Sequence, residues 1–378
     1  MRTHRAFQIG LFALALATSS AAFAGFTPTG SLGNGGRYAA ASARLPNGKV
    51  LVAGGFNGVN LASGEIYDPA TGTFTATPNS LSAARGFASV AVLANGKVLI
   101  AGGGDYDNSA DVVNADLYDP STGTFAPTGS LHTARCCATA TVLGNGKVLI
   151  AGGVTSNLTR LASAELYDPV AGTFSVTGSM AAARDLAVAA LLPNGKVLIT
   201  GGGDGSGVSV ASSELYDPAT GTFSPTGSLS VGRDEATANL LPNGKVLVAG
   251  GADNDVPFGT AEIYDPATGT FSASHSTFPG RRYASSVNLN DGRVLIVGGQ
   301  GMVGGNLTAL TDAQLYDPAT DTFGSAGPMH VARFFFPAQT LLDGRVLVAG
   351  GYNDLGVEGS AELWAFTDVV FANGFEGP

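Results

Sequence analysis

Seven arginines recur along the chain, and their spacing is the first pattern that suggests chemistry. Each stands 17 residues before a Gly-Gly pair. A guanidinium holds carboxylates and other anions through paired hydrogen bonds, so a ring of arginines would suit an anionic ligand. One acid recurs for nearly every arginine, however, and this favours repeated structural ion pairs. The arginines are Arg37, Arg85, Arg135, Arg184, Arg233, Arg281 and Arg333, and the acids are Glu65, Asp116, Glu165, Glu214, Glu262 and Glu362.

Two copies of the repeat depart from this rule and contain the candidate binding residues. In the sixth copy Gln314 replaces the acid and Arg282 directly follows Arg281, so we expect undercompensated positive charge there. The seventh copy adds a histidine and a run of phenylalanines. We predict a site for a ligand with an apolar or sugar face and an anionic group; the alternative is drift of one repeat, with the phenylalanines filling a central axis. The candidates are Arg281, Arg282, Tyr283, Gln314, His330, Arg333, Phe334 and Phe335. The remaining arginines are assigned a structural role, namely Arg37, Arg85, Arg135, Arg184 and Arg233.

The elements that position these residues follow from the repeat, whose period is 48 to 52 residues. Asn47-Gly48 and its copies are two-residue hairpin turns between apolar runs, and Tyr67-Asp68-Pro69 begins a second turn between short strands. Each copy therefore predicts four strands. Seven copies of this length favour an all-β, seven-bladed β-propeller over an array of β-sandwiches.

The Gly-Gly pair, the Tyr-Asp-Pro turn and the following aromatic residue resemble kelch repeats, such as those in the central domain of galactose oxidase. The resemblance spans about residues 26–366, with Phe74 and its copies where many kelch units have Trp. It implies a propeller fold, which by itself does not specify function. In galactose-oxidase-like chains a copper-binding histidine follows certain arginines by three residues. Here those positions are Ala40, Ala88, Ala138, Ala187, Ala236, Ala284 and Phe336, so we expect no copper and no other cofactor.

A second enzyme comparison leaves catalysis open. Kelch-bladed sialic-acid epimerases would need an arginine and an acid at the mouth of the propeller, and Arg282 with Asp234 or Glu235 fits that description. Clustering of these residues with Asp185 in one pocket would favour an enzyme. Dispersal around the ring would favour a non-catalytic binding module, which is the preferred interpretation.

Metal and redox chemistry have little support in the sequence. Residues 25–378 contain only His132, His275 and His330, which do not predict a shared metal site. The acidic segment 105–111 could ligate calcium, but a solvated loop is favoured. Cys136 and Cys137 are adjacent, and a disulfide between them would be strained, so two thiols are favoured.

The ends of the chain indicate export. Residues 1–24 have a basic start, an apolar run and an Ala-x-Ala site, as in a secretory signal peptide. We expect a protein that is secreted, periplasmic or at the cell surface, without a transmembrane segment. Loss of the signal moves the net charge from −10 to about −12, which argues against nucleic acid as a partner. Residues 367–378 form a tail of unassigned role.

Residues 25–366 are expected to close as one propeller. The segment that starts at Phe26 copies a fourth strand without its first three, so it should complete the last blade; the alternative is closure by Phe371. Loop length varies only on the face that carries the arginines. A rigid scaffold with variable loops on one face usually binds there. We therefore expect a monomeric binding module for a carbohydrate or an extracytoplasmic protein.

Overall fold

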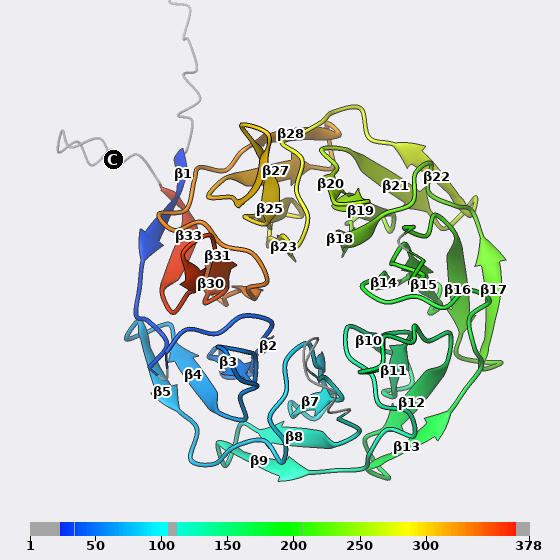
Figure 1. The fold of residues 1–378 in the computed structure, drawn as a ribbon, viewed down its shortest axis with the longest axis horizontal. Helices are drawn as coiled ribbons and strands as arrows, with labels where there is room; N and C mark the ends of the chain where they lie inside the picture. The colour runs from blue at the N-terminus through cyan, green and yellow to red at the C-terminus, as the bar shows by residue number, and fades with distance from the viewer. Residues whose placement is uncertain (1–22, 34, 105–111, 207, 368–378) are drawn as a thin grey trace, which may run out of the picture.

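Seven four-stranded antiparallel sheets are arranged as the blades of a closed ring (Figure 1). The computed structural model describes residues 23–33, 35–104, 112–206 and 208–367, and this part of the chain contains strands and no helix. The all-β, seven-bladed propeller predicted from the repeats is confirmed. Most of the expected signal peptide, the acidic segment 105–111, Phe371 and nearly all of the tail lie outside the described residues.

Each blade uses four successive strands, except that the seventh takes its outer strand from the start of the chain. Blade 1 contains β2 (Ala41–Arg44), β3 (Val50–Ala53), β4 (Gly64–Asp68) and β5 (Thr73–Ala76). Blade 2 contains β6 (Ser89–Val92), β7 (Val98–Ala101), β8 (Ala115–Asp119) and β9 (Thr124–Pro127). Blade 3 contains β10 (Thr139–Val142), β11 (Val148–Ala151), β12 (Ala164–Asp168) and β13 (Thr173–Val176). Blade 4 contains β14 (Val188–Leu191), β15 (Val197–Thr200), β16 (Ser213–Asp217) and β17 (Thr222–Thr226).

The last three blades carry short additional strands in the loop between their second and third main strands. Blade 5 contains β18 (Asp234–Leu240), β19 (Val246–Asp253), β21 (Ala261–Asp265) and β22 (Thr270–Ala273), with β20 (Val256–Pro257). Blade 6 contains β23 (Ser285–Asn288), β24 (Val294–Val297), β27 (Ala313–Asp317) and β28 (Thr322–Ser325), with β25 (Gln300–Val303) and β26 (Asn306–Ala309). Blade 7 contains β29 (Ala338–Thr340), β30 (Val346–Ala349), β33 (Ala361–Thr367) and β1 (Phe23–Pro28), with β31 (Tyr352–Asn353) and β32 (Gly356–Val357).

Local sequence chemistry sets the turns of each blade. In blade 1 the hairpin between β2 and β3 turns at Gly48, whose φ of +81° is one that glycine adopts without strain. The second turn begins with Asp68, whose Oδ1 accepts a hydrogen bond from the backbone N–H of Ala70 at 2.9 Å. The two turns lie at the same end of the blade, and the variable loops lie at the other.

The hydrophobic core is divided among the interfaces between neighbouring blades. The second strand of every blade is fully buried, as in β7, where Val98, Leu99 and Ile100 are 0% exposed. Its side chains pack against small residues of the innermost strands and against the tyrosines of the third strands. A threonine that follows the fourth strand also bonds the tyrosine hydroxyl of the next blade, as Thr128 does with Tyr167 at 2.8 Å. The blades therefore depend on one another for burial.

The ring is closed by pairing the two ends of the propeller in one sheet. β1 runs antiparallel to β33, with Phe26 opposite Trp364. Trp364 is fully buried, and its indole N–H donates to the carbonyl of Ala326 at 2.9 Å. Closure by the N-terminal strand is confirmed, and because β1 pairs directly with β33, the outer edge of β33 is not left open.

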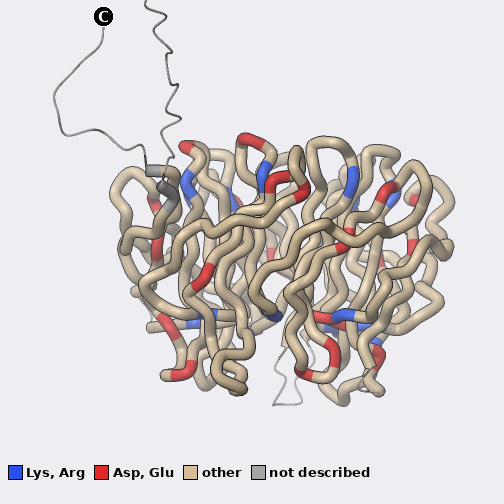
Figure 2. Tube along the Cα trace, turned by 90° about the horizontal axis from the view of Figure 1, so that it is seen from above, with Lys and Arg blue, Asp and Glu red and all other residues tan. Residues whose placement is uncertain are grey.

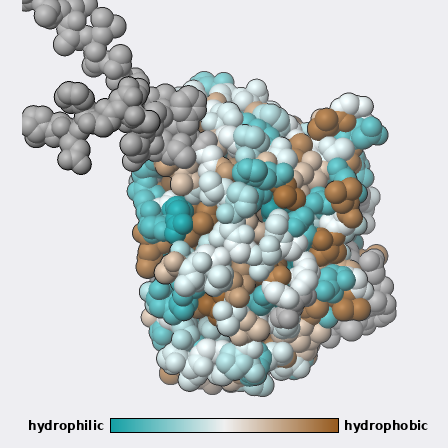
Figure 3. All heavy atoms as spheres, turned by 90° about the vertical axis from the view of Figure 1, so that its left-hand side faces the viewer, coloured by the Kyte–Doolittle hydropathy of each residue, from teal (hydrophilic) through white to brown (hydrophobic). Residues whose placement is uncertain are grey.

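Seen edge-on, the ring is a short cylinder with loops at both rims (Figure 2). The outer surface shown in Figure 3 has hydrophobic residues scattered among hydrophilic ones. The described residues contain no helix that is long and apolar enough to cross a membrane.

Candidate functional site

The repeated arginines form a buried collar, a term used here for the seven arginines and their acid partners. All seven arginines are at most 2% exposed. The nitrogen–oxygen distances in six pairs are 2.7 Å for Arg37 and Glu65, 2.9 Å for Arg85 and Asp116, 3.2 Å for Arg135 and Glu165, 3.3 Å for Arg184 and Glu214, 3.0 Å for Arg233 and Glu262, and 3.0 Å for Arg333 and Glu362. Burial lowers the pKa of Arg184, and the neighbouring Glu214 opposes this shift.

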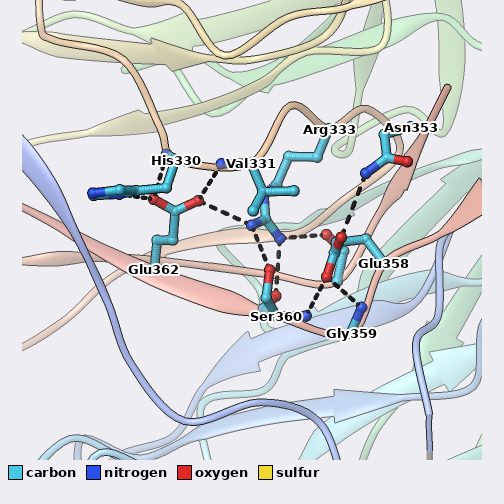
Figure 4. Close-up of polar contacts among 9 residues, drawn as sticks. His330, Val331, Arg333, Asn353, Glu358, Gly359, Ser360 and Glu362 are labelled. Carbon is cyan, nitrogen blue, oxygen red and sulfur yellow. Dashed lines mark hydrogen bonds and ion pairs between the residues drawn. The ribbon is translucent and has the colours of Figure 1, made fainter. Parts of the chain in front are cut away.

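The collar also explains why the spacing between each arginine and its Gly-Gly pair is constant. In blade 7, Arg333 Nη1 donates to the carbonyl oxygen of Gly350 at 2.7 Å, and the same bond recurs in every blade. Figure 4 shows the blade 7 pair, in which Arg333 contacts Ser360 and Glu362. The collar ties the first strand of a blade to its second and third strands, so its side chains are committed to structure.

The expected excess of positive charge in blade 6 is wrong. Arg281 pairs with Asp312, which lies two residues before Gln314 and takes over the role of the missing acid. Gln314 donates from Nε2 to both oxygens of that carboxylate, at 3.2 and 3.1 Å. Arg282 is also compensated, because it pairs with Asp255 and lies 3.5 Å from Glu235.

The two residues after each collar arginine build the mouth of the axis. The first pairs with the residue just after the Gly-Gly pair, as Asp185 does with Gly203. The second has positive φ in every blade, a backbone conformation that is uncommon for residues other than glycine. These positive-φ residues are Ala39, Phe87, Cys137, Leu186, Glu235, Tyr283 and Phe335.

The seven positive-φ residues are joined by a closed series of backbone hydrogen bonds, here called the axial belt. The N–H of each donates to the carbonyl of the positive-φ residue in the preceding blade, for example from Phe87 to Ala39 at 2.9 Å. The series ends where Ala39 donates to Phe335 at 2.8 Å, and the other five distances are 3.1, 3.1, 3.3, 3.2 and 3.4 Å. The belt fixes the backbone around the axis while leaving the side chains free to differ.

A cavity of about 640 Å³ opens inside the belt, on the face with the variable loops. Pockets of this size commonly take small-molecule ligands. Every blade contributes to its lining, through the residues that follow the collar arginines and through the loops that follow the Gly-Gly pairs. We call it the axial cavity.

One wall of the axial cavity is aromatic. It contains Tyr38 and Phe56 from blade 1, Phe87 from blade 2 and Phe335 from blade 7. The ring centroids of Tyr38 and Phe56 are 5.4 Å apart, as are those of Phe87 and Phe335. Phe335 also contacts Tyr283, with ring centroids 3.8 Å apart. Such a wall can stack on the apolar face of a planar or ring-shaped ligand.

The other wall is charged and comes mainly from blades 3 to 6. Arg160 Nε lies 3.3 Å from Asp185 Oδ2, and the Asp185 side chain is only 2% exposed. Glu235 is 7% exposed and has Arg282 and the phenol of Tyr283 as polar neighbours. This charged wall is lined by Arg160, Asp185, Asp234, Glu235, Asp255 and Arg282.

Two of these carboxyl groups have strongly shifted pKa values. Burial, together with the nearby Asp234, raises the pKa of Glu235 to about 8, although Tyr283 and Arg282 oppose the shift. Burial raises the pKa of Asp234 to about 6, with Asp185 and Asp253 adding to the effect. Both groups can therefore exchange protons near neutral pH, a property that is concentrated at functional sites.

Polar atoms in the lining are also left without partners. Asn60 Oδ1 and Glu235 Oε2 are buried and make no hydrogen bond to the described residues. An unsatisfied buried acceptor costs about 1–3 kcal/mol, so it is retained where it serves a purpose. Glu235 Oε2 lies 3.5 Å from Arg282 Nη1, so Asn60 Oδ1 is the one of the two atoms with neither a hydrogen-bonding nor an ionic partner among the described residues.

The structure separates the residues that the sequence grouped as one candidate site. Arg282, Tyr283 and Phe335 line the axial cavity. Phe334 packs behind them, with its ring centroid 6.2 Å from that of Tyr283. The others are outside the lining. Arg281 and Arg333 belong to the collar, Gln314 bonds to Asp312, and His330 bonds through Nδ1 to Glu362 at 2.9 Å (Figure 4).

The sequence interpretation missed most of the lining. Tyr38, Phe56, Asn60 and Phe87 were not predicted, and Asp185, Asp234 and Glu235 entered only as a test for an enzyme. The signal that identifies them is positional. They follow either the collar arginine or the Gly-Gly pair, at places where the repeat changes from blade to blade.

The residues present do not fit a copper centre of the galactose-oxidase kind. His132, His275 and His330 bond to Glu165, Asp321 and Glu362 in three different blades, and none lines the axial cavity. Across the described ranges, no group of three or more His, Cys, Asp or Glu side chains could hold a metal ion. Cys136 and Cys137 are not joined by a disulfide, and their Sγ atoms are 3.5 Å apart.

Seven blades of this topology around one axis define a β-propeller, and comparison with known proteins shows which motif its blades resemble. The kelch motif matches residues 37–80 and 134–181, which contain the strands of blades 1 and 3. A fungal alcohol oxidase of the AA5 family, solved in complex with copper, has a similar fold with a TM-score of 0.71 and 17% sequence identity. The similarity covers 91% of this chain and 76% of that one. No curated protein sequence matches the chain.

Proposed function

We propose that the protein binds a carbohydrate in the axial cavity. The observation that supports this most strongly is the pairing of an aromatic wall with a wall of carboxylates and arginines in one concave site. A sugar ring has an apolar face that stacks on aromatic side chains, and its hydroxyl groups exchange hydrogen bonds with polar side chains. Asn60 Oδ1, which makes no hydrogen bond to the described residues, would accept such a bond.

The setting of this activity is part of the proposal. We infer that binding takes place outside the cytoplasm, because residues 1–24 have the organisation of a secretory signal peptide. Intact mass measurement of the exported protein would test this, and a start at Gly25 is expected. A mature protein that keeps residues 1–24 would contradict it.

Binding is tested first on a glycan array and then by calorimetry with the best ligand. Phe335→Ala should weaken binding about tenfold or more, because central aromatic anchors often dominate an interface. Val170→Ala is the matched control, since Val170 is 97% exposed in the turn between β12 and β13, on the opposite rim. Equal affinities for the two variants would place the ligand elsewhere. A blank array would favour a protein partner instead.

A second candidate is an enzyme that moves protons on a sugar, such as an epimerase. Asp185, Asp234, Glu235 and Arg282 all line the axial cavity, and this clustering is the condition set from the sequence for favouring an enzyme. The raised pKa values of Asp234 and Glu235 suit general acid and base roles. Incubation of the bound sugar in D₂O would show exchange of a carbon-bound proton by NMR, and Glu235→Gln should abolish it.

A further inference from the structure

The axial cavity contains more acids than bases. Its lining includes four acidic side chains and two basic ones. Arg281 does not add a third basic side chain, because it is part of the collar and pairs with Asp312. An anionic ligand, as the sequence suggested, would therefore approach an excess of carboxylates. The acids are Asp185, Asp234, Glu235 and Asp255, and the bases are Arg160 and Arg282.

The ion pairs within the cavity leave one carboxylate available. Arg160 pairs with Asp185, and Arg282 pairs with Asp255 and Glu235. Asp234 makes no ion pair with any described residue and is partly exposed to the cavity. A cationic group that entered here would find a counter-charge that the protein itself does not neutralise.

Two carboxylates from neighbouring blades face the same small volume. A Cβ atom added to Gly203 would lie 3.0 Å from Asp185 Oδ1 and 3.5 Å from Asp234 Oδ2. Glycine leaves this volume open between the two oxygens. The buried Oε2 of Glu235 lies in the same lining, 3.5 Å from Arg282 Nη1.

We infer that the ligand of the axial cavity carries a cationic amine, with its ring against the aromatic wall and its ammonium group toward Asp234. This inference rests on the proposed carbohydrate binding and names the class as amino sugars. An ammonium group has three N–H donors and no acceptor, which matches a set of carboxylate oxygens. The aromatic wall would stack against the apolar face of the sugar ring.

Amine binding should release protons near neutral pH. The groups around Asp234 are Asp185, Asp253 and Arg282, and those around Glu235 are Tyr283, Arg282, Asp234 and Asp255. A bound cation favours the ionised forms of both carboxyls, whose pKa values are raised to about 6 and about 8. An N-acetylated sugar, which is neutral, should release fewer protons.

The test compares three disaccharides by calorimetry with the full-length protein at pH 7. The glucosamine disaccharide should bind at least about tenfold more tightly than its N-acetylated form, since hydrogen bonds to charged groups are the stronger kind. A galacturonate disaccharide should bind most weakly. Heats measured in two buffers of different ionisation enthalpy should show proton release for the amine alone.

Asp234→Asn separates charge from shape. It should remove the preference for the amine while leaving affinity for the N-acetylated sugar within about twofold, because the amide has nearly the same size. The control, Asp68→Asn, loses the same charge on the opposite rim, where Asp68 pairs with Lys49, and should keep the preference.

Each contrary result has a distinct meaning. Equal binding of the amine and its N-acetylated form, or tighter binding of galacturonate, would overturn the inference while the proposed carbohydrate binding stands. Absence of binding by all three sugars and by a general glycan array would overturn both.

Discussion

The collar and the axial cavity lie one or two residues apart in the sequence, yet they differ in almost every respect. Arg233 is buried, bonded within its blade and repeated in all seven blades, whereas the acid pair of Asp234 and Glu235 that follows it occurs in one blade only. The collar pairs each guanidinium with a carboxylate in every blade, although the Nε atoms of four of its arginines make no hydrogen bond to the described residues, namely Arg37, Arg184, Arg233 and Arg333. The arginine position therefore holds the backbone in every blade, whereas the two positions that follow it differ in chemistry from blade to blade.

The largest effect is expected from breaking the collar. Arg184→Leu removes the bonds to Gly201, Ser212 and Glu214 and leaves the Glu214 carboxylate buried without its cation. The free energy of unfolding should fall by about 3–5 kcal/mol, measured by urea denaturation. The control is Lys196→Ala in the same blade, where Lys196 forms an exposed pair with Asp217. A loss as large in the control would show that burial does not distinguish the two pairs.

A smaller but substantial effect is expected at the glycines that the collar contacts. Gly201 has a φ of +69°, and an added Cβ would lie 2.4 Å from the carbonyl oxygen of Arg233 in the next blade. Gly201→Ala should lower the free energy of unfolding by about 2–4 kcal/mol. Gly144→Ala is the matched control, because nothing lies within 4 Å of its added Cβ. Thermal denaturation of both variants would test this, and equal melting temperatures would refute it.

In the cavity, a substitution should increase stability instead. Burial gives Glu235 a pKa of about 8 in the native state, above its ordinary value of 4.5, so between these values the native state binds more protons than the unfolded state. Stability is therefore lost as the pH rises through this range. Glu235→Gln should remove that loss and be more stable at pH 9 by on the order of 1–3 kcal/mol.

Urea denaturation at pH 5, 7 and 9 measures this effect. The two proteins should converge in stability at pH 5 and separate as the pH rises. A remaining slope below about pH 6 is expected from Asp234, whose pKa is also raised. Parallel curves for wild type and variant would contradict the assignment.

The smallest effect is expected at a positive-φ residue of the belt. Leu186 lies two residues after Arg184, but its contribution to the belt is a backbone hydrogen bond, which any side chain leaves intact. Leu186→Ala should change the free energy of unfolding by less than about 1 kcal/mol. A loss of unfolding free energy comparable to that of Arg184→Leu would mean that the belt depends on side chains. The collar and cavity positions would then not differ in their contribution to stability.

Much of the scaffold could be predicted because the same turn and strand signals recur in all seven copies of the repeat. The turns at Asn47-Gly48 and Asp68-Pro69, and closure by the strand that contains Phe26, all follow from short-range patterns. The compensation of Arg281 was missed because Asp312 is shifted by two residues from the position of the other acids. Comparison of equivalent positions in the seven copies does not find an acid that is displaced by two residues.

The cavity was harder to predict, because it depends on distances between blades. Asp185 and Asp234 are 49 positions apart, yet their oxygens flank the same glycine. Tyr38 and Phe335 lie on opposite ends of the sequence and become neighbours only when the ring closes, with centroids 6.1 Å apart. The short strands β20, β25, β26, β31 and β32 fall in segments where the copies differ, so the repeat carried no information about them.

The pairing of β1 with β33 has a consequence for how the chain folds. Thr27 Oγ1 donates to the carbonyl of Leu363, which is 336 positions away. The first strand to leave the ribosome must therefore wait for the last, and ring closure carries the entropy cost of a very long loop. Contacts that form so late stabilise the folded state against unfolding more than they accelerate folding. The propeller should accordingly be slow to assemble and slow to come apart.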